Sequence, residues 1–217
     1  MSVGTLYPYC KAGEPTRTRV IVLLGLIKYF KLDVEVSDPD SHFPSEFVAC
    51  RVPAFRYPCG KPLTESIPIT LKLAELVSDK NVLFGDNSPA QRAEILGWMQ
   101  IFNIELMNNV AVYLLQTLGT TKYDAESFDN SWKQVERQLS IIDAHLTKNT
   151  YLVGEKITLA DLYCVPMLYK GLLLLWDPAF RARFPAVMRW FETVNKSPIF
   201  DGFFDNMKYA TEYKRPQ

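Results

Sequence analysis

The chain has 217 residues, of which 48% are hydrophobic, and its 24 basic and 24 acidic side chains balance to a formal net charge of zero. That hydrophobic content is enough for one large or two small folded domains, while the balanced charge argues against a general nucleic-acid or membrane-surface binder. No apolar run is long enough to span a bilayer, and no signal-peptide pattern is visible at the N-terminus, so we expect a cytoplasmic protein.

The first 80 or so residues alternate between strand and helix patterns. Apolar residues recur at helical spacing between 15 and 30, and they alternate with charged residues between 32 and 36, as in a strand. Further strands are predicted at 4–9, 53–57 and 62–64, and a further helix at 66–78. The order β-α-β followed by β-β-α is typical of a thioredoxin-like domain, which we place at residues 1–81.

After a polar linker at residues 82–87, every strong pattern is helical. Ser88 and Gln91 form a predicted capping box with Pro89 at the first helical position, and Ile95, Trp98, Phe102 and Leu106 continue on roughly one face. A second helix is predicted at about 125–148, with an apolar stripe at Trp132, Val135, Leu139, Ile142 and Leu146. We therefore expect an all-helical domain at residues 88–210 and the start of another linker at 211–217.

The strongest local motif is Ile157-Thr158-Leu159-Ala160-Asp161. Thr158 can cap a helix by accepting from the Asp161 backbone N–H, and the Asp161 carboxylate can reach back to the Thr158 N–H. The motif by itself indicates a well-made helix start, and Thr158 and Asp161 are therefore predicted to be structural residues.

The cysteines and histidines indicate neither disulfide bonds nor a metal site. Four cysteines without a C-x-x-C pair or regular spacing are typical of free thiols in a reducing cytosol, and they stand at Cys10, Cys50, Cys59 and Cys164. His42 and His145 are the only histidines and lie far apart in the sequence, so no zinc site is predicted.

A wider pattern combines these segments. Val52-Pro53-Ala54-Phe55 is followed about a dozen residues later by Thr64-Glu65-Ser66, and the capping motif at 157–161 is followed by Phe-Pro-Ala-Val-Met-Arg-Trp-Phe at 184–191. Together they resemble the glutathione transferase family over almost the whole chain. The resemblance implies an α/β plus all-α fold, in which a thioredoxin-like N-terminal domain precedes an all-helical C-terminal domain whose buried central helix starts at Thr158.

The resemblance also implies a glutathione site. Pro53 would follow a cis peptide bond, and Val52 would offer its backbone amide and carbonyl to the cysteinyl part of the ligand. Glu65 and Ser66 would hold the γ-glutamyl group at a helix N-terminus, where amide groups and the helix dipole favour a carboxylate, although the same two residues also suit an ordinary N-cap. Arg51 would pair with the glycyl carboxylate. Glutathione is thus the expected ligand, and no cofactor is required.

A catalytic residue is harder to assign. Transferases of this fold activate the thiol of glutathione with a hydroxyl or thiol near the end of the first strand. No serine stands in this region, so Tyr7 is the candidate hydroxyl, with a packed strand residue as the alternative interpretation. Cys10 lacks the Cys-Pro-Phe/Tyr context of thiol-using classes, and Thr16 would lie inside the start of the helix. We therefore expect weak or absent transferase activity.

A narrower resemblance favours a different function. The segments Gly4–Tyr7, Arg51–Phe55, Tyr151–Asp161 and Phe180–Pro185 resemble the elongation factor 1-gamma family, and fungal members in particular. This implies a scaffolding subunit that anchors the nucleotide-exchange subunits of the elongation factor 1B complex and, through them, serves the tRNA-carrying GTPase. No direct contact with nucleic acid or membrane is expected, and a homodimer is a further option.

Two other functions remain open from the sequence. The chain could be an active cytosolic glutathione transferase, or a transferase-like interaction module of a tRNA synthetase. The absence of the serine and the linker-like tail favour the scaffold over the transferase.

Overall fold

The computed structural model describes residues 2–8, 17–38, 47 and 51–213, and these residues form two compact units. The sheet unit comprises Met1–Lys80 together with Ser197–Phe203. The helical unit comprises Asn81–Lys196 together with Phe204–Gln217. The predictions for Cys10, Thr16, His42 and Cys50 lie outside the described residues.

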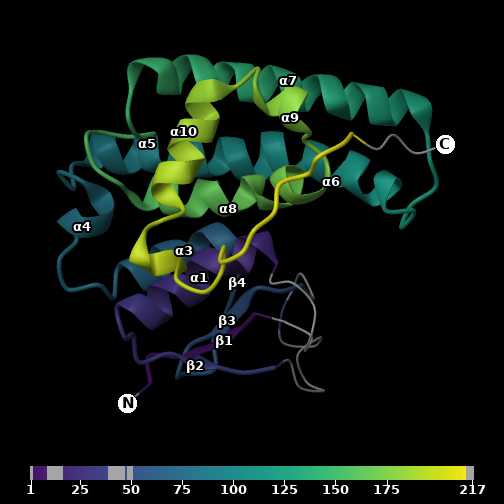
Figure 1. Cartoon of the computed structure of the whole chain (residues 1–217). Helices are drawn as coiled ribbons and strands as arrows, with labels where there is room; N and C mark the ends of the chain where they lie inside the picture. The colour runs from purple at the N-terminus through teal and green to yellow at the C-terminus, as the bar shows by residue number, and fades with distance from the viewer. Residues whose placement is uncertain (1, 9–16, 39–46, 48–50, 214–217) are drawn as a thin grey trace. The chain divides into compact units, whose positions relative to one another are not determined.

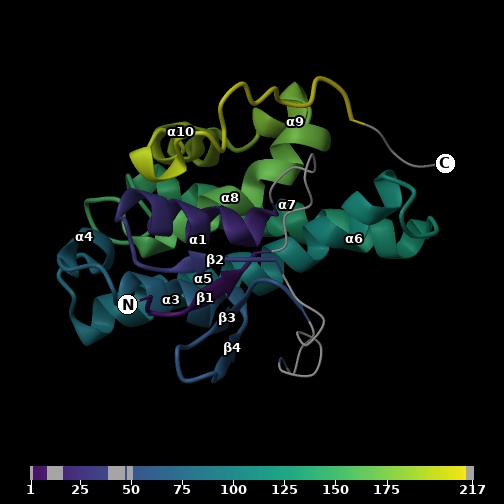
Figure 2. The ribbon, with the colours of Figure 1, turned by 90° about the horizontal axis from the view of Figure 1, so that it is seen from below.

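The sheet unit carries a four-stranded sheet in the order β2-β1-β3-β4, which Figure 2 shows. Strand β1 pairs in parallel with β2 and antiparallel with β3, and β3 pairs antiparallel with β4. This confirms the predicted β-α-β and β-β-α order. The strands are short, with bounds Thr5–Tyr7 for β1, Glu35–Val36 for β2, Ala54–Arg56 for β3 and Pro62–Thr64 for β4.

Two helices and a late segment of the chain complete the sheet unit. Helix α1 (Thr18–Tyr29) packs against α3 (Ser66–Ala74) and against the 3₁₀ helix η2 (Pro198–Phe200). Gly25 makes the contact with η2 possible, because a Cβ at this position would lie 2.5 Å from the carbonyl oxygen of Ile199. The Lys28 Nζ also donates to the carbonyl oxygen of Asp201, at 3.1 Å. The sequence patterns did not predict that residues 197–203 belong to this unit.

The helical unit contains seven α-helices within the described residues and one π-helical segment (Figure 1). The long helix α7 packs along the π-helix η1 and α6, while α8 contacts α5, α6, η1 and α10. The bounds are Asn81–Phe84 for α4, Pro89–Gln100 for α5, Ile101–Leu106 for η1, Met107–Thr117 for α6, Ala125–Lys148 for α7, Leu159–Leu174 for α8, Pro178–Arg181 for α9 and Pro185–Val194 for α10.

Helix α8 is the core of the helical unit. Apolar side chains occur on all sides of this helix, and twelve of its sixteen residues are buried, including Asp161. A helix that is apolar all round must be surrounded by other elements, which agrees with its four helical neighbours. The predicted stripe of α7 is also confirmed, with Val135, Leu139, Ile142 and Leu146 buried and Trp132 half-buried.

Three local predictions need correction. The strand expected at 32–36 is only Glu35–Val36, and both residues are exposed. The capping box at Ser88 forms only in part: the Ser88 hydroxyl accepts from the Gln91 amide, but the Gln91 side chain accepts from the Asp86 amide instead of reaching back to Ser88. The Ser88 amide instead donates to the Asp86 carboxylate, at 2.8 Å. Part of the expected linker at 82–87 is helix α4, with Leu83 and Phe84 buried.

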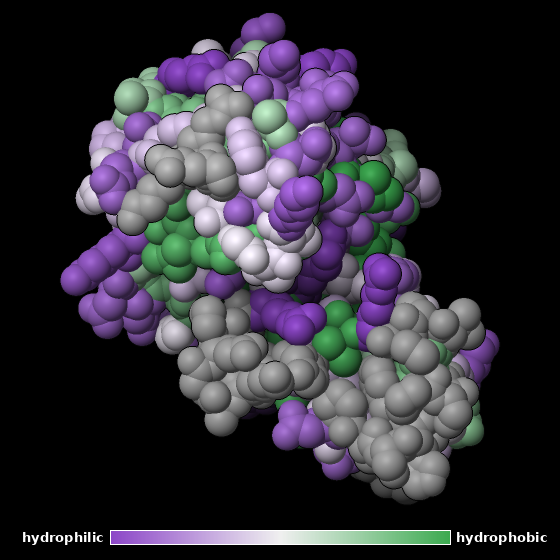
Figure 3. All heavy atoms as spheres, turned by 90° about the vertical axis from the view of Figure 1, so that its right-hand side faces the viewer, coloured by the Kyte–Doolittle hydropathy of each residue, from purple (hydrophilic) through white to green (hydrophobic). Residues whose placement is uncertain are grey.

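The surface is mixed in character. On the face shown in Figure 3, hydrophilic side chains dominate outside the grey atoms, and hydrophobic ones appear in small areas between them. Across the part of the chain that the structure describes, no helix has both the length and the apolar character needed to cross a membrane. Within the same residues, no cluster of three or more histidine, cysteine, aspartate or glutamate side chains is arranged to hold a metal ion.

Candidate functional site

The strand register of the sheet unit gathers the predicted site residues at one end of the sheet. Tyr7 pairs with Ala54, and Ala54 pairs on its other side with Thr64. The residues just before Ala54 and just after Thr64 therefore leave the sheet next to the end of β1. This end of the sheet, which we call the strand-end site, comprises Tyr7, Val52, Pro53, Glu65 and Ser66.

The bend before β3 has the predicted geometry. The Val52–Pro53 peptide bond is cis, which confirms that prediction. Pro53 is buried, whereas Val52 is half-buried and packs against the cluster of Tyr7, Phe47 and Ala54. Because Val52 lies before the first paired residue of β3, its backbone groups are positioned at the end of the ladder, where an extended ligand could add to it.

Glu65 stands in an unusual backbone conformation directly before α3. Its φ of 72° and ψ of 138° lie in a region that residues other than glycine rarely adopt. Such strain costs about 1–3 kcal/mol and persists where the surrounding structure enforces it, often at binding sites. Among the described residues, the Glu65 carboxylate makes no capping hydrogen bond to the first turn of α3, so the simple N-cap interpretation does not account for it.

The N-terminus of α3 is the most polar part of the strand-end site. Ser66 is only 2% exposed, while Glu65 is exposed. A helix leaves its first amide groups without intrahelical partners, and the helix dipole adds a partial positive charge there. With nine residues, α3 is long enough for this effect, so a carboxylate in front of Ser66 is electrostatically favoured.

Tyr7 is packed as a core residue. Its side chain is 3% exposed, and its ring lies edge-on to Phe47 with the centroids 5.8 Å apart. The Arg56 guanidinium lies over the Tyr7 ring, 4.9 Å from the ring centre, in a cation–π arrangement. These contacts pack the Tyr7 ring into the sheet unit, and the role of its hydroxyl stays a prediction.

The arginine that contacts Tyr7 is Arg56, whereas Arg51 was the arginine predicted to belong to the site. Arg51 is exposed, one residue beyond the cis bend, whereas Arg56 lies at the end of β3 and contacts both Tyr7 and Phe47. No sequence motif singled out Arg56. Strand alternation was the available signal for Arg56, because it places the Arg56 side chain on the face of the sheet opposite to Phe55.

In the helical unit, Thr158 and Asp161 form the predicted capping box at the start of α8. One Asp161 oxygen accepts from the Thr158 amide at 2.8 Å, and the other accepts from the Leu152 amide at 2.9 Å and from the Trp190 indole at 2.8 Å. Burial raises the pKa of the Asp161 carboxyl, and these hydrogen bonds act against that rise. The carboxylate thus joins the loop before α8 to α10, which makes its role structural.

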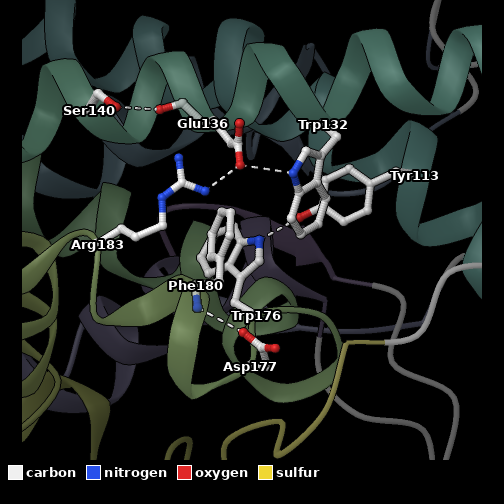
Figure 4. Close-up of polar contacts among 8 residues, drawn as sticks. All are labelled: Tyr113, Trp132, Glu136, Ser140, Trp176, Asp177, Phe180 and Arg183. Carbon is white, nitrogen blue, oxygen red and sulfur yellow. Dashed lines mark hydrogen bonds and ion pairs between the residues drawn. The ribbon is translucent and has the colours of Figure 1, made fainter.

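A second network of polar contacts, partly buried, lies around α9 (Figure 4). The Trp176 indole donates to the Tyr113 hydroxyl at 2.6 Å, and burial raises the pKa of that hydroxyl. The Glu136 carboxylate accepts from the Trp132 indole at 3.0 Å and pairs with Arg183. These contacts connect Trp176, before α9, to Tyr113 of α6, and Arg183, after α9, to Glu136 of α7, so their role is structural.

Comparison with known proteins assigns the chain to a family. Residues 94–198 match the family model described as the glutathione S-transferase C-terminal domain. The chain is 34% identical to elongation factor 1-gamma 1 of Saccharomyces cerevisiae over its whole length, but it spans only 52% of that protein.

Two further relatives are covered almost completely. A putative elongation factor 1 gamma homolog of Saccharomyces cerevisiae is 33% identical, with 100% of this chain and 99% of the relative aligned. The crystal structure of the glutathione S-transferase-like domain of elongation factor 1-gamma from the same yeast superposes with a TM-score of 0.87, at 34% identity and with complete coverage of both chains. The sequence similarity thus extends over the entire chain, including both units and the strand-end site. The chain belongs to the elongation factor 1-gamma family.

Proposed function

We propose that this chain is a scaffolding domain of the translation elongation machinery, which anchors a nucleotide-exchange subunit of elongation factor 1B. The observation that carries the proposal is the whole-chain similarity to elongation factor 1-gamma proteins, one of which aligns over 99% of its own length. The neutral overall charge supports action through protein contacts rather than through nucleic acid.

The packing of Tyr7 supports a scaffold over an enzyme. A hydroxyl that activates a thiol must be within hydrogen-bond reach of that thiol, whereas the Tyr7 side chain is 3% exposed and covered by Phe47 and Arg56. We therefore expect conjugation of an aryl halide to saturating glutathione to run far below the roughly 1–1,000 turnovers per second of ordinary enzymes.

The test of the scaffold function is calorimetry of this chain with the N-terminal region of the exchange-factor subunit. Stable binding is the expected result, and failure of the unmodified chain to bind would reject the function. Glu65→Ala and Ser66→Ala serve as controls, because the strand-end site is not the proposed docking surface. Loss of binding in these variants alone would mean that the strand-end site itself had become the protein interface.

A second function is favoured by the strand-end site: binding of glutathione without turnover. The supporting observations are the position of Val52 at the end of the β3 ladder, the strained Glu65 and the buried Ser66 at the start of α3. Titration with reduced glutathione should give saturable binding that Ser66→Ala weakens by roughly tenfold, which corresponds to the loss of one charge-assisted hydrogen bond. Equal binding in Ser66→Ala would contradict the assignment of this site.

A further inference from the structure

The helical unit carries an open groove on the side of α10 that faces away from its core. The residues Pro185, Met188, Arg189, Glu192 and Thr193 follow each other at steps of three, one, three and one, so they lie on one face of the helix. The opposite face is buried through Val187, Trp190, Phe191 and Val194. The groove has a volume of about 670 Å³, and its other walls come from α9 and from Tyr209.

The wall at Tyr209 belongs to the strap, by which we mean the segment Phe204–Tyr213, which contains no helix or strand. Figures 1 and 2 both show the strap running past α9. The Ala210 amide donates to the Leu172 carbonyl oxygen at 2.8 Å, and Arg181 donates to the Ala210 carbonyl oxygen at 2.7 Å. The Arg181 guanidinium also lies 5.0 Å from the centre of the Tyr209 ring. The groove is therefore formed before any partner binds.

The groove is positively charged although the chain as a whole is neutral. Arg181, Arg189 and Lys196 line it, against the single carboxylate of Glu192. Arg189 donates to the carbonyl oxygens of Leu146 and Asn149, and such neutral acceptors leave its charge in place. Four apolar residues also line the groove and are referred to as the apolar strip: Pro178, Ala182, Pro185 and Met188.

We propose that this groove docks a segment of a partner protein in which carboxylates flank an apolar side chain. The cations would attract the carboxylates, and the strip around Met188 would contact the apolar side chain. A nucleic-acid backbone fits less well, because the apolar lining around Met188 has no counterpart in a sugar–phosphate chain, whereas a peptide can place an apolar side chain there. The proposal rests on the scaffold function above, and the partner is the exchange-factor subunit.

The experiment compares matched variants of the whole chain by calorimetry with the N-terminal region of that subunit. Lys196→Glu and Met188→Glu change exposed or half-buried groove positions without touching the bonds that hold the strap. Lys133→Glu and Ile141→Glu, which make the same changes in charge at exposed positions of α7, serve as controls. The expected result is a loss of affinity of about tenfold for the double groove variant and less than twofold for the double control.

Two further measurements sharpen the result. Binding of the unmodified chain should weaken as salt rises, and the gap between the groove variant and the control should narrow, because exposed charges are screened. Hydrogen exchange in the unmodified complex should show added protection in α10 and the strap, which tests the groove even if a variant fails to fold.

Each outcome separates the two proposals. Equal affinity of the groove and control variants, without added protection at α10, overturns the groove and leaves the scaffold function intact. No binding by the unmodified chain rejects the scaffold function and the groove with it. Binding of a labelled 20-nucleotide RNA that Lys196→Glu abolishes, with subunit binding unchanged, would reassign the groove to nucleic acid and overturn the proposed occupant.

Discussion

Truncation of Asp161 to alanine should be among the most damaging single changes in the helical unit. The carboxylate accepts from the amides of Leu152 and Thr158 and from the indole of Trp190, and these three residues are at most 2% exposed. Alanine would leave three buried N–H groups without their acceptor. The effect should therefore exceed that of removing an ordinary helix cap.

The magnitude follows from the number of orphaned donors. Each buried donor without a partner costs about 1–3 kcal/mol, while removal of a buried carboxylate recovers part of its desolvation cost. We expect a net loss of about 2–5 kcal/mol in the free energy of unfolding, out of a total of about 5–15 kcal/mol for a typical domain. For a chain of this size, that loss corresponds to a drop of roughly 10 °C in melting temperature.

Urea denaturation followed by tryptophan fluorescence is the appropriate assay, because all four tryptophans of the chain, Trp98, Trp132, Trp176 and Trp190, lie in the helical unit. Asp124→Ala is the matched control: Asp124 caps α7 by accepting from the Ser127 amide, but in an exposed setting, so its loss should cost about 1 kcal/mol. Equal losses for Asp161→Ala and Asp124→Ala would refute the reasoning from buried donors.

Three further changes test other parts of the fold. Tyr113→Phe should cost about 1–3 kcal/mol by leaving the Trp176 indole without its acceptor, and a double-mutant cycle with Trp176→Phe should recover part of that loss, which urea denaturation can measure. Glu65→Gly should relieve the strain at a φ of 72° by more than the backbone entropy that glycine adds to the unfolded chain, and so raise the unfolding free energy by about 1 kcal/mol; a destabilisation of more than about 1 kcal/mol, the cost of that entropy alone, would show that this conformation is not strained. In a Cys10→Ser/Cys50→Ser background, a thiol reagent at pH 8 should modify exposed Cys59 and spare Cys164, because burial keeps the Cys164 thiol inaccessible and raises its pKa; two reactive thiols in the native protein would contradict this.

The motifs that could be predicted from sequence are those with short-range physical causes. The cap at Thr158 and Asp161 needs only residues three apart, and the stripe of α7 depends only on helical spacing. The cis bond at Val52–Pro53 came from a family resemblance and was confirmed. In contrast, the burial of Tyr7 depends on Phe47 and Arg56, and no local pattern predicts that these side chains meet.

The π-helix η1 has a signal in the sequence that was not used to predict it, namely the spacing of its buried residues. Phe102, Leu106 and Val110 are fully buried and lie four residues apart. Four residues overshoot a 3.6-residue turn, so an uninterrupted α-helix would rotate this series steadily away from the core. A segment with a wider turn at Ile101–Leu106 keeps the series facing inward, and the repeated step of four was the clue to it.

The contact between Gly25 and Ile199 has a consequence for synthesis of the protein. The sheet unit is discontinuous in sequence, since its last piece, residues 197–203, follows nearly the whole helical unit. During translation, the surface of α1 at Gly25 therefore stays exposed until Ile199, more than 170 residues later in the chain, has been synthesised. A recombinant fragment that stops at Lys80 would keep that surface exposed, and a sheet unit meant to fold alone would need residues 197–203 joined back to it.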